Sequence, residues 1–240
     1  MYGDLTDSIF STESSIMTKT YKKLIIWDFD GVIADTEHLW LENRRKLLKK
    51  YFNIDWDLAV TNNHIGGMNW RTRIATLQKM GIPVNEKFEE EATAADYEIM
   101  NKGLSLTENV KKIFHHAEIK QCIATGGSME KTKQKLKMCN IEKIFSDNNI
   151  FVADMVKQGK PAPDLFLHAA KMMGEKPEEC IVIEDSPAGI KAAQNAKMDV
   201  IAYTGSKMNN NAAYKEKIKK LGVTKIFDNM YDIEKLLFPK

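Results

Sequence analysis

Two carboxylates follow directly on an apolar stretch near the start of the chain. The residues "LIIW" at 24–27 lead into Asp28, Phe29, Asp30 and Gly31. Residues two apart on an extended segment point to the same side, so Asp28 and Asp30 face the same way. Two unit charges repel by about 4 kcal/mol at 4 Å and an effective dielectric near 20. A buried strand would avoid such a pair, so the pair indicates a site that needs negative charge.

Other apolar runs also end in polar residues. The run "CIA" leads to Thr125 and Gly126, and "CIVI" leads to Glu184 and Asp185. Between them, "GKPAPD" puts Lys160 ahead of a helix that two prolines help to begin. Open parallel sheets bind ligands at the carboxyl ends of their strands, so we expect these side chains to converge.

The chemistry of this set is that of phosphoryl transfer. Four carboxylates against one lysine need more positive charge, and an all-oxygen donor set favours Mg²⁺. One of the two aspartates can attack phosphorus and form an aspartyl-phosphate. The other can protonate the leaving oxygen and then take a proton from water, and neighbouring negative charge is expected to raise its pKa. The Thr125 hydroxyl can bind phosphoryl oxygens.

Short apolar runs alternate with helical patterns in most of the chain. Strands are predicted near 23–27, 120–124, 150–153, 180–183, 199–203 and 225–227. Continuously apolar strands alternating with helices predict a parallel sheet covered on both faces. Between the first and second strands, helices are predicted at 37–52, near 70–80 and at 86–102, and another follows at 108–117.

The pattern therefore predicts an α/β protein with a Rossmann-like parallel sheet core and an inserted helical cap domain. The core comprises 21–35 and 105–240, and the cap comprises 36–104. Residues 1–20 are predicted to be a disordered N-terminal extension, because they lack the basic start and long apolar stretch of a secretory signal.

Four stretches resemble the motifs of the haloacid dehalogenase-like hydrolases. They are "DFDGVIADTE", "IATGGS", "GKPAPDLFLHAA" and "IEDSPAGIKAAQNAKM", and their order resembles the phosphatase and phosphomutase branch with a helical cap. The resemblance implies that Asp28 is the nucleophile and Asp30 the acid/base. It implies that Thr125, with Gly126, and Lys160 bind the phosphoryl group.

The resemblance also implies a Mg²⁺ site and a residue of the cap. Asp28, the Asp30 carbonyl and Asp185 would hold the ion, with Glu184 ligating it or supporting a ligand. Glu37 resembles a glutamate of many phosphatases of the family and is a candidate to contact the substrate. An ordinary surface charge on the first cap helix is the alternative for Glu37.

Two departures favour a phosphatase over a beta-phosphoglucomutase-type phosphomutase. Trp40 stands where those mutases carry a histidine, and Ser128 and Met129 replace a lysine and an asparagine that bind a distal phosphate. Lys131 and Lys133 follow on a helix whose facing the sequence leaves open. A non-enzyme that holds an aspartyl-phosphate, for signalling or as a scaffold, is the alternative of another class.

Composition sets the remaining expectations. The net charge of +2 gives no sign of nucleic-acid binding, and no apolar run approaches the roughly 20 residues that span a membrane. Three cysteines without close spacing favour a reducing, cytoplasmic compartment. We expect a monomer whose partner is a small phosphorylated metabolite, and a solvated helix face at "RRKLLKK", 44–50.

Overall fold

A computed structural model describes residues 22–239 and contains one parallel sheet within them. Its six strands lie in the order β3-β2-β1-β4-β5-β6. They are β1 (Leu24–Trp27), β2 (Lys120–Thr125), β3 (Ile150–Val152), β4 (Cys180–Glu184), β5 (Asp199–Tyr203) and β6 (Ile226–Phe227). The predicted strands and the Rossmann-like α/β fold are confirmed. The extension predicted at 1–20 lies outside the described residues.

Helices cover both faces of the sheet because its strands are apolar on both sides. Ile25 and Trp27 of β1 pack with α5 (Val110–Phe114), α6 (Met129–Met138) and α10 (Met230–Leu237) on one face. Leu24 and Ile26 pack with α7 (Asp164–Met173) and α8 (Pro187–Asn195) on the other. All four side chains are fully buried, which stabilises the fold by about 1.5–3 kcal/mol for each Leu or Ile.

The remaining elements of the core are short. Helix α9 (Ala212–Lys219) packs against β5 through Ile218. The 3-10 turns are Asp147–Asn149, Ala153–Met155 and Pro177–Glu179. Cys122, Cys139 and Cys180 are buried and unpaired, as ordinary thiols. Within residues 22–239, none of the helices has the length and apolar character needed to cross a bilayer.

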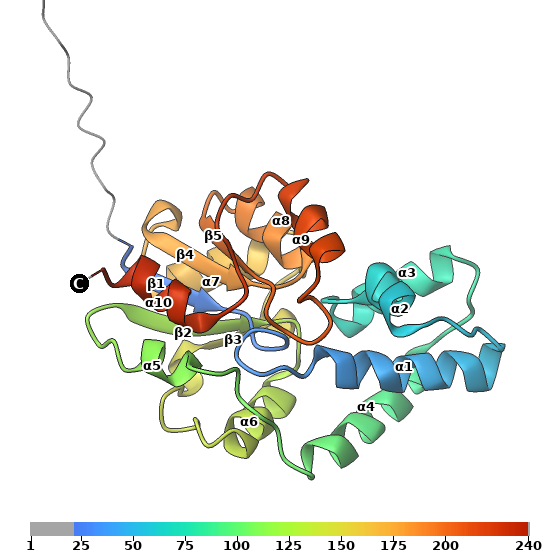
Figure 1. The fold of residues 1–240 in the computed structure, drawn as a ribbon. Helices are drawn as coiled ribbons and strands as arrows, with labels where there is room; N and C mark the ends of the chain where they lie inside the picture. Colours follow the sequence, from blue (N-terminus) through green and yellow to red (C-terminus); the bar gives the residue numbers. More distant parts are fainter. Residues whose placement is uncertain (1–21, 240) are drawn as a thin grey trace, which may run out of the picture.

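Of the five helices between β1 and β2, the first four lie together to one side of the sheet and are called here the inserted helices (Figure 1). They are α1 (Glu37–Phe52), α2 (Leu58–Ile65), α3 (Trp70–Lys79) and α4 (Glu86–Met100). They share an apolar cluster of their own, which includes Leu41, Leu48, Ile65, Leu77 and Phe88. The short helix α2 was not predicted, although Asp57 accepts a hydrogen bond from the Val60 N–H and caps its start.

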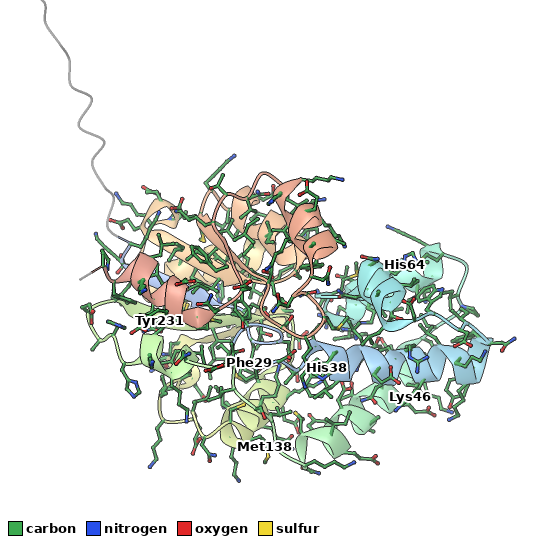
Figure 2. All side chains as sticks on the ribbon, in the orientation of Figure 1. Phe29, His38, Lys46, His64, Met138 and Tyr231 are labelled. Carbon is green, nitrogen blue, oxygen red and sulfur yellow. The ribbon has the colours of Figure 1, made fainter. Side chains whose placement is uncertain are left out.

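The prediction of a solvated face at 44–50 is wrong for Arg44. Lys46 is exposed on α1 (Figure 2), but the Arg44 side chain is only 4% exposed and lies against α4. Burial of this guanidinium is possible because Asp96 and Glu89 of α4 pair with it.

Candidate active site

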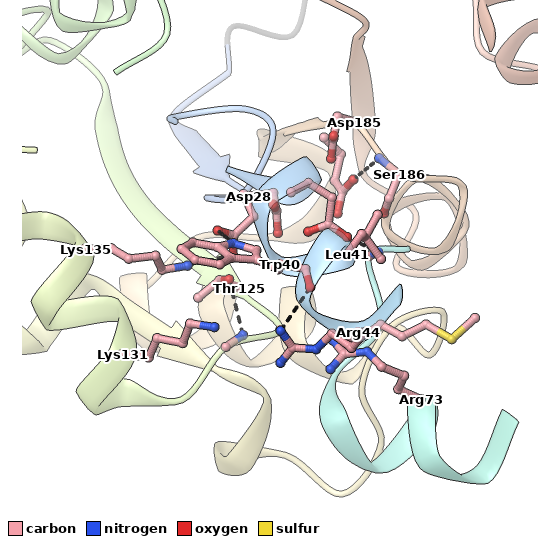
Figure 3. Close-up of a pocket in the computed structure, with 17 residues that line it drawn as sticks. Asp28, Trp40, Leu41, Arg44, Arg73, Thr125, Lys131, Lys135, Asp185 and Ser186 are labelled. Carbon is pink, nitrogen blue, oxygen red and sulfur yellow. Dashed lines mark hydrogen bonds and ion pairs between the residues drawn. The ribbon is translucent and has the colours of Figure 1, made fainter. Parts of the chain in front are cut away.

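The carboxyl ends of β1, β2 and β4 meet at one pocket between the sheet and the inserted helices (Figure 3). Seven of the eight predicted site residues line the pocket: Asp28, Asp30, Glu37, Thr125, Gly126, Glu184 and Asp185. The eighth, Lys160, contacts two of them from the core side. The sequence prediction thus names a set that the fold brings together.

Lys160 joins the ends of β1 and β4. It is 3% exposed, and its Nζ donates to Asp28 Oδ1 and, at 2.7 Å, to Glu184 Oε1. The other Glu184 oxygen accepts the Ser186 N–H at 2.6 Å. Burial raises the pKa of Asp28 to about 7, with Glu184 and Asp30 adding to the effect of burial and Lys160 opposing it.

Asp185 faces the same pocket, and no cation among residues 22–239 forms an ion pair with it. Its Oδ2 accepts a hydrogen bond from Asn209 Nδ2 at 2.9 Å. Burial, followed by the charges of Glu184 and Asp28, raises its pKa well above the ordinary value. Three buried carboxylates, those of Asp28, Glu184 and Asp185, therefore lie near the Lys160 ammonium, which pairs with the first two.

This charge imbalance fits a divalent cation. The donor set predicted for Mg²⁺ contains the carboxylates of Asp28 and Asp185 and the Asp30 carbonyl, with Glu184 as a further ligand or as support for one. Residues 22–239 contain no group of three or more His, Cys, Asp or Glu side chains placed to hold a metal ion. Mg²⁺ tolerates this, because it keeps several waters and few protein ligands. Gly31 has φ +85°, and a Cβ there would lie 2.0 Å from Asp185 Oδ2, so only glycine lets the backbone approach.

Asp30 is held by three donors, each at 2.6 Å. Thr36 Oγ1 and Trp40 Nε1 donate to its Oδ1, and Lys135 Nζ donates to its Oδ2. Burial disfavours the charged form, but the Lys135 ammonium and the hydrogen bonds outweigh it and lower the pKa of Asp30 to about 2. The expectation of a raised pKa is therefore wrong for this arrangement, because it considered the neighbouring carboxylates and omitted Lys135.

The sequence profile of the haloacid dehalogenase-like hydrolases matches residues 25–203, which spans β1 to β5. The chain belongs to this family. It is 30% identical to the fructose-1-phosphate phosphatase YqaB of Escherichia coli, over 74% of this chain and 94% of that protein. It is 28% identical to a phosphorylated carbohydrates phosphatase of Thermotoga maritima, over 80% and 89%. The prediction of a phosphatase-type hydrolase of this family is confirmed.

Solved structures of haloacid dehalogenase-like proteins share the fold. One of unknown function from Agrobacterium tumefaciens has a TM-score of 0.76 and 24% identity, covering 90% of this chain and 97% of that one. A putative beta-phosphoglucomutase from Bacteroides vulgatus has a TM-score of 0.72 and 24% identity, covering 90% and 87%. At these identities the likeness supports the fold alone.

The inserted helices of this haloacid dehalogenase-like hydrolase close over the pocket. Glu37 Oε1 accepts the Gly67 N–H at 2.8 Å, which fastens the loop before α3 to α1. Arg71 of α3 pairs with Asp154 of the core at 3.1 Å. The cavity holds about 70 Å³, well below the roughly 300–1,000 Å³ of typical small-molecule sites.

Sequence reasoning missed several charged residues of the pocket. Lys135, Arg44 and Arg73 line it, and so does Lys131, whose facing was undecided. Lys133 instead turns away and pairs with Asp147 at 2.7 Å. The spacing of Lys131 and Lys135, one helical turn apart, is the signal that could have placed both on one face of α6. Trp40 also lines the pocket.

Replacing Lys135 by methionine is expected to destabilise the protein. The ammonium is fully buried against Asp30, so its removal leaves a buried carboxylate without its cation. The free energy of unfolding in urea should fall by about 3 kcal/mol. The matched variant Lys133→Met lies on the same helix but loses only the exposed ion pair with Asp147. Its free energy of unfolding should change by no more than about 1 kcal/mol. Equal values for the two variants would show that Lys135 is not a cation that Asp30 depends on.

Proposed function

We propose that this protein is a Mg²⁺-dependent phosphatase that hydrolyses a small phosphorylated metabolite through an aspartyl-phosphate. The observation that carries the proposal is the position of Asp28. Its carboxylate lies at the end of β1 beside the Lys160 ammonium, with Asp30 two residues away and oriented by three donors. A nucleophile next to a cation and an acid/base group is the arrangement that phosphoryl transfer requires.

The steps follow from the side chains present. Thr125 and Lys160 orient the phosphoryl group, and an Asp28 oxygen attacks phosphorus in line with the leaving oxygen. The P–O bond to the alcohol breaks, and Asp30 donates the proton that the alcohol takes. Because its pKa of about 2 leaves Asp30 ionised in the closed arrangement, it must take up this proton from solvent before the transfer. In the second half Asp30 accepts a proton from water, whose oxygen attacks phosphorus. The bond to Asp28 breaks, and inorganic phosphate leaves with both carboxyl groups restored.

Asp28, Asp185 and the Asp30 carbonyl would hold Mg²⁺ in this proposal. When bound, the ion adds positive charge to phosphoryl oxygens as the transition state forms. Glu184 has a different role, because both of its oxygens are already occupied by Lys160 and Ser186. We assign it to holding Lys160 against Asp28.

The inserted helices would act as a cap. The proposed division is a cap of residues 36–104 on a core of 21–35 and 105–240. The two crossings at 34–37 and 103–107 would then be the hinge, and Gly103, at φ +93°, has the conformational freedom a hinge needs. The small cavity supports this reading, since a closed cap excludes bulk water from Asp28.

The substrate class is a phosphate monoester of small size, such as a sugar phosphate. The relatives named for fructose 1-phosphate and for phosphorylated carbohydrates support this class. We favour hydrolysis over a mutase reaction because Trp40 occupies the position of the mutases' histidine and donates to Asp30.

The test is turnover of p-nitrophenyl phosphate. Activity should appear with Mg²⁺, vanish in EDTA, return with added Mg²⁺ and not with Ca²⁺, which prefers more ligands at longer distance. Full activity in EDTA would overturn the metal requirement. A signalling or scaffold protein would show no turnover. With β-glucose 1-phosphate and a trace of glucose 1,6-bisphosphate, a phosphatase releases inorganic phosphate, whereas a mutase forms mainly glucose 6-phosphate.

A further inference from the structure

Three cations line the end of the pocket that is formed by the inserted helices. They are Arg44 of α1, Arg73 of α3 and Lys131 of α6, called here the cation cluster. In Figure 3 their charged groups point toward the same region of the pocket, apart from Asp28 and Asp185. The mechanism proposed above uses none of the three. Ser128 and Met129 stand in place of the residues that bind a distal phosphate in the mutases. The cation cluster supplies positive charge in the pocket by other residues.

The carboxylates that pair with the cation cluster stand behind it. Both guanidinium groups contact Glu89 Oε2, Arg44 at 3.3 Å and Arg73 at 2.7 Å. Asp96 Oδ2 accepts from Arg44 at 2.6 Å and also from Lys131. Neither Glu89 nor Asp96 lines the pocket, whereas the three cations do. The cluster therefore presents positive charge to the pocket. Its ion pairs set three cations against two carboxylates, and Glu37, which also lines the pocket, adds a carboxyl group near Arg73 and Arg44.

Part of the donor capacity of the cluster is unused. Among residues 22–239, the buried Nε atoms of Arg44 and Arg73 have no hydrogen-bond partner. The Arg44 side chain is only 4% exposed, so water does not readily replace the missing partner. Burial, together with the charges of Arg44 and Lys135, lowers the pKa of Lys131 to about 8 despite its pairing with Asp96. The cluster thus brings three cations to one end of the pocket, with two guanidinium donors and one carboxylate oxygen, Glu89 Oε1, that have no hydrogen-bond partner in the described part of the chain.

We propose that the substrate carries a second anionic group, a carboxylate or a second phosphate, and that the cation cluster binds it. This inference rests on the proposed function, because the first anionic group is the phosphoryl group held beside Asp28. The end of the pocket at Asp28 then carries out the reaction, and the end at the cation cluster selects the substrate. Arg44 and Arg73 lie on the inserted helices α1 and α3, whereas Lys131 lies on α6, which packs on the sheet. A second anion bound by all three would therefore draw the inserted helices toward α6.

The experiment compares matched phosphate monoesters. The probes are phosphorylated hydroxy acids such as 2-phosphoglycolate and the corresponding alkanediol bisphosphates, called dianionic here because they carry two anionic groups. The controls are hydroxyalkyl monophosphates, called neutral because their second group is an uncharged hydroxyl. Each series has members with two, three and four carbons. We expect kcat/KM to be at least about tenfold higher for one dianionic series than for the neutral series. The series that is preferred identifies the second group as carboxylate or phosphate. Equal kcat/KM for all three series would overturn the proposal.

Two pairs of variants locate the effect. Lys131→Gln and Arg73→Gln should lower kcat/KM for the preferred dianion by about 10- to 100-fold and change the neutral probe by less than about threefold. Lys133→Gln on α6 and Lys79→Gln on α3 are exposed controls and should leave both unchanged. Equal losses on the dianionic and neutral probes would mean that the cluster only holds the helices together, and would overturn the proposal.

Binding separates this inference from the proposed function. Titration calorimetry with the Asp28→Asn protein measures affinity for the same probes without turnover. A preference for the dianion that is lost in Asp28→Asn/Lys131→Gln supports the cation cluster even if no probe is hydrolysed. Turnover of p-nitrophenyl phosphate without any dianion preference would leave the phosphatase standing and refute the second anionic group.

Discussion

Replacing Asp28 by asparagine is expected to abolish turnover and the phospho-enzyme together. The carboxylate is the group that would bond to phosphorus, and an amide cannot replace it as a nucleophile. We expect kcat/KM for p-nitrophenyl phosphate to fall by about 10⁴-fold or more. Acid-quenched mass spectrometry after a short reaction should find a phosphate adduct on Asp28 in the unmodified protein and none in the variant.

Folding should survive this change. Asp28 is one of three buried carboxylates that lie close together near Lys160, so neutralising it relieves repulsion from Glu184 and Asp185. The melting temperature of Asp28→Asn should therefore match or exceed that of the unmodified protein in metal-free buffer. Asp147→Asn, an exposed aspartate far along the chain, is the control for the amide substitution. A phosphate adduct on Asp28→Asn at the native level would place the nucleophile elsewhere.

The fold was predictable because each strand is continuously apolar. A run such as "CIVI" can be buried on both faces only in a parallel sheet covered by helices, and the strand ends then converge by topology. The residues at those ends, from Asp28 to Asp185, were therefore predictable without knowing any helix orientation. The same reasoning identified α1 with its bounds, since its apolar residues recur at helical spacing.

The residues that come from helix faces were not predictable in this way. Arg44 looked like part of a solvated stretch, and only the packing of α1 on α4 buries it against Asp96. Lys135 contacts Asp30 from 105 positions away, and its role depends on how α6 rotates over the sheet. A sequence with two lysines one turn apart is compatible with either facing. The pKa of Asp30 was therefore predicted from the wrong set of neighbours.

Replacing Asp30 by asparagine is expected to slow both halves of the reaction but to spare the nucleophile. For an alkyl phosphate, the leaving alkoxide needs a proton, and kcat should fall by about 10²- to 10⁴-fold. p-Nitrophenolate leaves without a proton, so transfer to Asp28 should proceed from p-nitrophenyl phosphate. Hydrolysis of the phospho-enzyme still lacks its base. The variant should therefore give a burst of p-nitrophenol near one equivalent and then accumulate phosphate on Asp28.

The contacts of Asp30 decide how this experiment must be controlled. Asparagine keeps an oxygen for Thr36 and Trp40, but its amide nitrogen would face the Lys135 ammonium at the site of a 2.6 Å hydrogen bond. Two donors facing each other in a buried site destabilise the fold. The double variant Asp30→Asn/Lys135→Met removes that clash and must show the same burst and the same adduct. Steady turnover of alkyl phosphates by either folded variant, within about threefold of the unmodified protein, would contradict acid/base catalysis by Asp30.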